Sequence, residues 1–210
     1  MLIEVQNLYR VLDTFLDLLF PPREDERLVR TVSPEALAKL VEPQPVGEAT
    51  ALLPFGDIRV RALIHEAKYH GSSKAFELLG GVLGSYLAEQ ELAGAVLVPV
   101  PLGSKRRAER GYNQSEEVAR RAARRAGLAL DAHILVRTRD TPSQTNLARW
   151  QRRENVTNAF LCPAGMSEEE KACTYILIDD VTTTGATLDS AAQALRAAGA
   201  ARVIAIALAH

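Results

Sequence analysis

Two adjacent carboxylates, Asp179 and Asp180, stand directly before a stretch of small residues that could bind an anion. They follow the short apolar run 175–178, whose length and β-branched content are typical of a buried strand. Six small residues come next, at 182–187, and an alanine-rich segment with apolar residues at helical spacing continues the chain. Loop N–H groups, threonine hydroxyls and the N-terminus of that helix would together suit a phosphate group. Gly185 would let the backbone approach the anion closely or adopt a positive φ.

The acidic pair must face something other than the phosphate, because two carboxylates beside a phosphate would repel it. Vicinal sugar hydroxyls need acceptors of this kind, and a hydrated Mg²⁺ would also suit them. A phosphorylated ribose meets both demands. The loop has neither the Gly-Lys-Ser/Thr of a Walker A loop nor the Gly-x-Gly-x-x-Gly of a dinucleotide site. The alternative is a strand, turn and helix in which the two acids merely cap the helix.

The order of residue types in this stretch resembles the phosphoribosyl pyrophosphate (PRPP) signature of type I phosphoribosyltransferases. The shared features are an apolar strand, Asp-Asp, an apolar residue, a threonine triplet, glycine, and a threonine two residues later. The resemblance implies that the two aspartates are the candidate catalytic residues and that Mg²⁺ is held mainly through PRPP. It assigns PRPP binding to nine consecutive residues: Asp179, Asp180, Val181, Thr182, Thr183, Thr184, Gly185, Ala186 and Thr187.

Four further blocks resemble the ComF family of competence proteins, in the family's order, from about residue 57 to the C-terminus. They lie at residues 64–71, 98–102, 110–115 and 137–160. By analogy with the pyrophosphate loop of phosphoribosyltransferases, the resemblance implies that Lys105, Arg106 and Arg110 contact pyrophosphate. It also implies a candidate closing loop with Gln144, Arg149 and Arg153.

The N-terminal region departs from the ComF pattern, in which a four-cysteine zinc module is typical. Residues 23–57 contain neither Cys nor His, and thiolates or imidazoles are the ligands that zinc normally needs. The sequence therefore predicts a protein without zinc and puts in doubt any role that relatives perform through the module. We expect residues 1–55 to hold an amphipathic helix and a degenerate segment, the latter a polar insert or linker. Residues 56–210 would form the phosphoribosyltransferase-like domain.

The elements that must position these residues alternate between helices and apolar strands. Helices are predicted at 57–71, 73–91, 113–126 and after 187, and strands at 95–100, 134–136, 159–161, 175–178 and 203–208. This alternation predicts an α/β fold: a parallel, type I phosphoribosyltransferase-like sheet with helices on both faces, plus the N-terminal helix and a reduced, zinc-less N-terminal region. Asp179 and the turn at 101–105 both follow strand ends, so they can converge on one pocket.

Other polar residues have weaker claims on the site. Lys68 and Tyr69 lie in a ComF-like block, but packing is as good an interpretation as ligand contact. His65 and His70 are five residues apart, a poor spacing for one helical face, so no metal site is predicted. The arginine run 120–125 reads as a solvated helix face, with DNA contact as the lesser alternative.

Composition and charge narrow the class of protein. The chain has 210 residues and a net charge of −1, but residues 101–155 carry 13 Lys/Arg against 6 Asp/Glu. That basic middle is consistent with a polyanionic ligand. No apolar run is long enough to span a bilayer and no signal-peptide pattern is found, so a cytoplasmic location is expected.

Two functions remain open at this stage. In the first, a ComF-like protein binds PRPP or a nucleotide and works with protein partners of the DNA-uptake and recombination machinery in natural competence. Weak contact with single-stranded DNA is expected, because Tyr112 and Trp150 are the only aromatics in the basic segment. In the alternative, the protein is an active phosphoribosyltransferase that moves phosphoribose from PRPP to a nitrogenous acceptor, a nucleobase or an amine.

Overall fold

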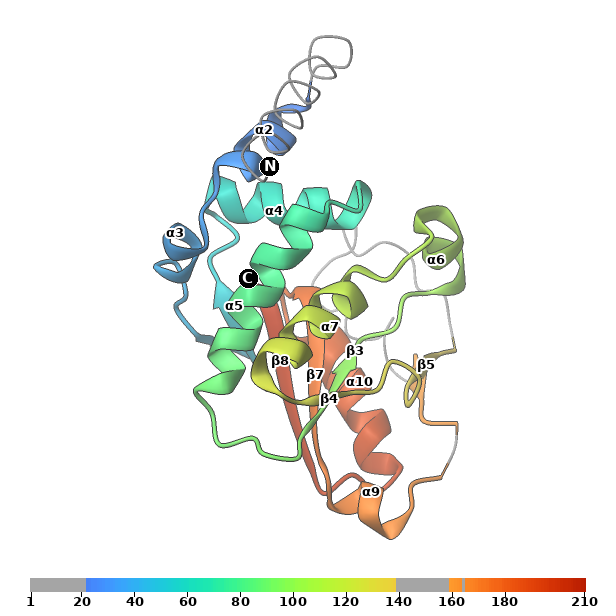
Figure 1. Ribbon diagram of the computed structural model, residues 1–210. Coiled ribbons are helices and arrows are strands. Elements are labelled where there is room, and N and C mark those ends of the chain that lie inside the picture. The colour runs from blue at the N-terminus through green and yellow to red at the C-terminus, as the bar shows by residue number, and fades with distance from the viewer. Residues whose placement is uncertain (1–21, 139–158, 164) are drawn as a thin grey trace, which may run out of the picture.

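A six-stranded sheet forms the centre of the molecule (Figure 1). The computed structural model describes residues 22–138, 159–163 and 165–210. The strand order is β1-β2-β8-β7-β3-β4, and a separate pair is formed by β5 and β6. The bounds are β1 Gln44–Val46, β2 Ala49–Leu53, β3 Val96–Pro99, β4 Ala129–Leu130, β5 Val136–Arg137, β6 Phe160–Leu161, β7 Thr174–Val181 and β8 Arg202–Ala209.

The sheet is parallel except at one edge, where β1 runs antiparallel to β2. Successive side chains of β7 point to opposite faces, as a strand requires. Ile176 and Ile178 join the core on one face, whereas Tyr175 and Leu177 join the core on the other. Because both faces are covered, β7 reads as a continuous apolar run in the sequence. The predicted α/β fold with a parallel sheet and helices on both faces is confirmed.

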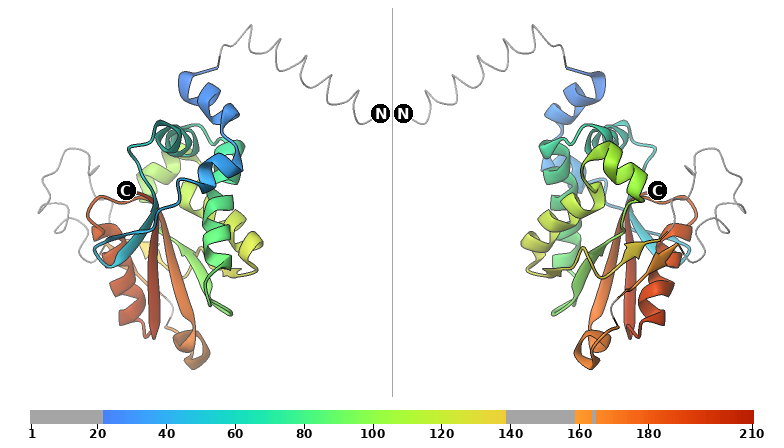
Figure 2. Two further views of the ribbon diagram at one scale, coloured as in Figure 1. Left: turned by 90° about the vertical axis from the view of Figure 1, so that its left-hand side faces the viewer. Right: turned by 90° about the vertical axis from the view of Figure 1, so that its right-hand side faces the viewer.

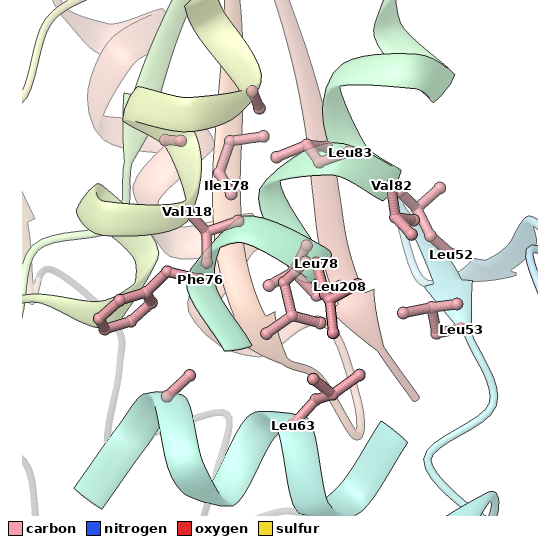
Figure 3. Close-up of a cluster of buried hydrophobic side chains, with 14 of the residues drawn as sticks. Leu52, Leu53, Leu63, Phe76, Leu78, Val82, Leu83, Val118, Ile178 and Leu208 are labelled. Atoms are coloured by element: carbon pink, nitrogen blue, oxygen red, sulfur yellow. The ribbon is translucent and has the colours of Figure 1, made fainter. Parts of the chain in front are cut away.

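One face of the sheet is covered by three helices: α4 (Ile58–Tyr69), α5 (Ser73–Ala88) and α7 (Gln114–Ala126). Figure 3 shows their side chains meeting those of the strands, with Val118 between Phe76 and Ile178, and Leu63 below Leu208. Helices α5 and α7 approach each other closely at Gly80, where an added Cβ would lie 2.6 Å from the Cβ of Arg121. The close contact therefore depends on glycine.

The opposite face is covered by α10 (Ala186–Ala197), which returns the chain from β7 to β8. The two side views in Figure 2 show α10 on one side of the sheet and α5 and α7 on the other. The short helix α9 (Glu168–Ala172) precedes β7 and begins with a capping box between Ser167 and Glu170. Among the described residues, no helix combines the length and hydrophobicity needed to cross a membrane.

The N-terminal region is more ordered than the expected insert or linker. Residues 22–54 form α2 (Glu24–Thr31), α3 (Pro34–Ala38), β1 and β2, and β2 pairs in parallel with β8. Val29, Leu37 and Leu52 are buried in the same core as the inward side chains of α4, α5 and α7. The expected N-terminal helix before residue 22, and the candidate closing loop with Gln144, Arg149 and Arg153, lie outside the described residues.

Candidate functional site

The predicted site residues follow two strands that lie side by side. Strands β3 and β7 are parallel neighbours, with Pro99 paired to Ile178, and the N–H of Val100 donates to the carbonyl of Ile178 at 2.9 Å. From β3 the chain continues to α7 on one face, and from β7 it continues to α10 on the other. The crevice between two strands whose helices depart to opposite faces is the usual ligand site of such sheets.

The loop between β7 and α10 is built from its own threonines. The Thr182 hydroxyl accepts from the N–H of Gly185 at 3.0 Å, and the N–H of Ala186 points at the Thr184 hydroxyl at 3.4 Å. Thr182 is buried, and its N–H donates to the carbonyl of Ala209 at 3.0 Å. The loop is thus fixed to the end of β8 while Thr183, at its tip, stays exposed.

Gly185 is required by the protein itself. Its φ is +81°, and an added Cβ would lie 2.9 Å from the carbonyl oxygen of Val46. The turn after β1 therefore packs directly on the loop, since a Cβ at Gly47 would lie 3.4 Å from the carbonyl oxygen of Thr184. Sequence reasoning attributed the glycine to close ligand approach or a positive φ; the structure shows the positive φ and a contact within the chain.

Helix α10 has Gly185, which carries no side chain, at its N-cap position, and the Thr184 hydroxyl lies 3.4 Å from the N–H of Ala186 in its first turn. The carboxylates of Asp179 and Asp180 accept instead from the N–H groups of Asp180 and Val181, so the alternative that the two acids merely cap this helix is not what the structure shows. A helix N-terminus next to a hydroxyl-rich loop carries a partial positive charge. Such an end is suited to an anion.

The Asp180 side chain is only 10% exposed, and three groups contact its carboxylate oxygens. Its Oδ2 accepts from the Gln114 amide at 2.9 Å and lies 3.1 Å from the Lys68 ammonium. Its Oδ1 accepts from the N–H of Val181 at 2.7 Å. The carboxylate is thereby fixed in position at the end of β7.

Asp179 has fewer direct partners. Its Oδ1 accepts from the N–H of Asp180 at 2.9 Å and lies 3.5 Å from the Ser115 hydroxyl. Burial, and then the neighbouring charge of Asp180, raise the pKa of Asp179 to about 7, whereas Lys68 and Arg137 act in the opposite direction. A perturbed carboxyl next to a fixed one is typical of functional sites.

Of the three residues predicted to contact pyrophosphate, Arg110 is joined to the acidic pair. Its guanidinium donates to the Gln114 side-chain oxygen at 3.0 Å, and Gln114 in turn donates to Asp180. Lys105 and Arg106 lie about one turn earlier on the same short helix, α6 (Ser104–Arg110). Figure 1 shows α6 at the end of the sheet where β3 and β7 terminate.

The segment after α6 positions the start of α7 at the site. The side chain of Asn113 donates to the carbonyl of Val100 at 3.0 Å and caps α7 by accepting from the N–H of Ser115. Asn113, Gln114 and Ser115 are all buried. The cap brings the N-terminal end of α7 against the acidic pair of β7.

Sequence reasoning did not name Gln114 and Ser115 as site residues, and it left Lys68 open between packing and ligand contact. The signal was present, because Gln114 and Ser115 belong to the block 110–115 and Lys68 to the block 64–71. Nothing in a single sequence shows, however, that these blocks meet the acidic pair across 64 to 112 residues of chain. Their contact is a property of the folded sheet.

His65, Glu66 and His70 form a group that could hold a metal, since one ligand atom from each lies within 4.8 Å of the others. Both Glu66 oxygens, however, accept from the Arg23 guanidinium, at 3.1 and 2.9 Å. His65 Nδ1 in turn lies 2.9 Å from an Asp25 oxygen. These contacts join α2 to α4, and a metal here would have to break the Arg23–Glu66 pair.

Two of the four arginines of α7 have acidic partners, whereas Arg124 donates to the carbonyl of Arg120 and Arg125 to the Ser85 hydroxyl. Arg120 pairs with Glu116 at 2.7 Å, and Arg121 pairs with both Glu117 and Glu77, at 2.7 and 2.8 Å. Arg120, Arg124 and Arg125 are exposed, as the predicted solvated helix face requires, whereas Arg121 is largely buried against α5.

Comparison with known proteins places this site in a family context. Residues 108–210 match the family model described as the phosphoribosyl transferase domain. DNA utilization protein YhgH of Salmonella typhi is 34% identical over 146 residues, which cover 67% of this chain and 63% of that protein. Competence protein F of Haemophilus influenzae is 34% identical over 103 residues, 49% of this chain and 44% of the relative.

Competence protein ComFC of Bacillus subtilis is 35% identical over 107 residues, 48% of this chain and 38% of the relative. The chain thus spans less than two thirds of the length of these relatives. Among solved structures, glutamine phosphoribosylpyrophosphate amidotransferase from B. subtilis is 20% identical, with a TM-score of 0.44, and the match covers 68% of this chain and 30% of that one.

Proposed function

Since the chain belongs to the ComF family of competence proteins and carries their phosphoribosyltransferase-type domain, we propose that it binds PRPP, or a nucleotide with the same phosphoribose unit, in a pathway of DNA uptake and recombination. The names of the relatives, DNA utilization protein and competence protein, support this context. In this proposal the protein works in the cytoplasm and through protein partners of that machinery.

The observation that carries the proposal is the juxtaposition of a fixed acidic pair with a hydroxyl-rich loop and the N-terminus of α10 at one strand end. The loop 182–187 would bind the 5′-phosphate through its N–H and hydroxyl groups. Asp179 and Asp180 would accept hydrogen bonds from the ribose hydroxyls. Arg110, with Lys105 and Arg106 on the same helix, would contact the pyrophosphate.

The metal requirement follows from the ligand. Mg²⁺ is bound in many sites through a few carboxylates and the phosphates of the substrate, so PRPP itself would carry most of its coordination. The acidic pair would then read the sugar, and no residue of this chain is proposed as a dedicated metal ligand. Folding without zinc is part of the same proposal, because residues 23–57 provide no Cys or His.

Transfer of phosphoribose to a nitrogenous acceptor is the second candidate function. The raised pKa of Asp179 favours it, because a carboxyl that titrates near pH 7 can exchange a proton during a reaction. In that case PRPP would lose pyrophosphate, and the carboxylates would lie near the positive charge that develops on the ribose. Release of pyrophosphate in the presence of a nucleobase or amine would distinguish transfer from binding alone.

The test of PRPP binding is a ratio of two affinities, for PRPP with Mg²⁺ and for inorganic phosphate, measured by calorimetry. Phosphate would use only the loop, whereas PRPP would also use the carboxylates. Asp180→Asn should therefore weaken PRPP by about tenfold or more while phosphate binds as well or better. Asp179→Asn should shift the ratio in the same direction.

A mere structural role of the pair would give a different result. Both ligands would then lose affinity alike, and the ratio would stay constant in wild type, Asp179→Asn and Asp180→Asn. A constant ratio would therefore contradict the PRPP assignment. Circular dichroism of each variant checks that the comparison is made between folded proteins.

A further inference from the structure

We propose that Lys68 is a positioning residue of the ligand site, which holds Asp180 from helix α4 so that the acidic pair can receive the hydroxyls of a phosphoribose ligand. The proposal rests on the proposed function, and it names a residue outside the PRPP loop and outside the predicted pyrophosphate residues. It also decides the role of Lys68 in α4, which the sequence left open between packing and ligand contact.

The contact geometry supports this role. An ionised carboxylate has about four lone-pair positions, two on each oxygen. On Asp180 the described residues use three of them: Lys68 and Gln114 at Oδ2, and the N–H of Val181 at Oδ1. One acceptor position therefore remains at Oδ1 for a hydroxyl of the ligand. Lys68 and Gln114 together fix the orientation that leaves this position available.

Lys68 is itself held in place by its neighbours in α4. The Tyr112 hydroxyl donates to the carbonyl of Ala67 at 2.9 Å and accepts from the N–H of Gly71 at 2.8 Å. On the other side of Lys68, the Tyr69 ring lies 5.1 Å from the Arg110 guanidinium carbon. The last turn of α4 is thus anchored on both sides of Lys68, which reduces the entropy lost when the ammonium holds the carboxylate.

The charges around the pair explain why a cation is needed there. Two carboxylates lie next to each other, and Asp180 has little exposure to water that could screen it. Lys68 from α4 is in direct contact, Arg137 from β5 acts on Asp179 over a longer range, and Arg110 from α6 reaches the pair through Gln114. Without Lys68, protonation of Asp179 would be favoured further, and a protonated acid is a poorer acceptor for sugar hydroxyls.

The experiment compares Lys68→Met, Lys68→Arg and wild type, with Lys74→Met on α5 as the matched control for loss of one surface charge. PRPP and inorganic phosphate affinities are measured by calorimetry between pH 6 and pH 9. We expect Lys68→Met to weaken PRPP about tenfold to a hundredfold, as for loss of a charged hydrogen bond, with a much smaller effect on phosphate. The PRPP affinity of Lys68→Arg should lie within a few fold of the wild-type affinity. The PRPP affinity of Lys74→Met should equal that of wild type.

The pH dependence separates positioning from simple structural support. In Lys68→Met the pH at which PRPP binding falls to half should move upward, because Asp179 would keep its proton to a higher pH. PRPP affinity within twofold of wild type, with the same midpoint, would overturn the proposal.

A second readout keeps this inference distinct from the proposed function. Carbon-13 NMR of the aspartate carboxyl groups in the ligand-free protein gives the pKa of Asp179 directly, in wild type and in Lys68→Met. A higher pKa in Lys68→Met supports the role of Lys68 even if wild type fails to bind PRPP, a result that would contradict the proposed function alone. An unchanged pKa would overturn the role of Lys68.

Discussion

Asp179 and Asp180 are neighbours in the chain but have different environments. Asp180 accepts from an ammonium, an amide and a backbone N–H, whereas Asp179 has a backbone N–H and a longer contact to a hydroxyl. Two adjacent carboxylates that are partly shielded from water cannot both ionise easily, so the pKa of one of them is raised. The structure surrounds Asp180 with three donors, and Asp179 is the carboxyl whose pKa is raised.

This asymmetry predicts how stability depends on pH. The pKa of Asp179 is about 7 in the folded protein, above the ordinary 3.8 of the unfolded chain. Its contribution to the free energy of unfolding is therefore largest below pH 4, declines as the pH rises to 7, and is flat above that. Asp179→Asn removes this decline. We therefore expect the free energy of unfolding of the variant, relative to that of wild type, to be higher at pH 8 than at pH 5 by roughly 1–3 kcal/mol.

Urea unfolding at pH 5, 6.5 and 8 measures the difference, with the exposed Glu169→Gln as the control that should leave the pH profile unchanged. A variant that loses stability relative to wild type as the pH rises would show that Asp179 is ionised and favourably paired in the folded protein.

At the level of elements, strand β7 and helix α10 are the unit that carries the site, and the sequence predicted both. The apolar run 175–178 is buried on both faces, which makes it readable as a strand, and the small residues after it allow only a tight loop. The structure extends the strand to Val181, because Asp179 and Val181 still pair with Ala207 and Ala209 of β8. Because two of the last side chains of the strand are polar, hydrophobic periodicity does not reveal where the strand ends.

The sequence did not predict the N-terminal hairpin, for a physical reason. Strands β1 and β2 have three and five residues, and β2 joins the sheet by pairing in parallel with β8. Short strands whose partner is about 155 residues away leave little local pattern. Yet the turn between them packs on the loop at Gly185, so the segment expected to be a linker supports the candidate phosphate site.

The helix that delivers Lys68 gives a prediction at this scale. Tyr112→Phe removes the hydroxyl that joins Ala67 to Gly71 but keeps the ring that packs on Phe76. We expect a loss of about 1–2 kcal/mol in the free energy of unfolding, since two backbone groups lose a partner. PRPP affinity should fall with it, because the last turn of α4 no longer holds Lys68.

Tyr86→Phe on α5 is the matched control and should change neither quantity. Loss of stability without loss of PRPP affinity would show that the position of α4 does not influence the site.

At the scale of the whole molecule, charge is unevenly distributed along the chain but partly neutralised in the fold. The basic segment 101–155 includes α7, where Arg120 and Arg121 pair with acidic side chains on α7 and α5. Pairing reduces the positive potential that a nucleic acid would meet. Among the described residues, the acidic pair at the strand ends contains a carboxyl with a raised pKa, whereas Arg120 on the outer face of α7 is exposed and paired.

This distribution predicts weak binding of single-stranded DNA that depends steeply on salt. Each phosphate contact contributes a slope of about −0.7 in the logarithm of affinity against the logarithm of salt concentration. Without a series of aromatic rings for base stacking, such contacts would be the main source of affinity. Fluorescence anisotropy of a labelled oligonucleotide at 50 and 200 mM salt measures the slope.

Arg120→Glu with Arg124→Glu, on the outer face of α7, should weaken binding of the oligonucleotide further, whereas Arg202→Glu on β8 should weaken it less. Tight binding that persists at 200 mM salt and is insensitive to the α7 double variant would place the nucleic-acid surface elsewhere and contradict this reading of the charge pattern.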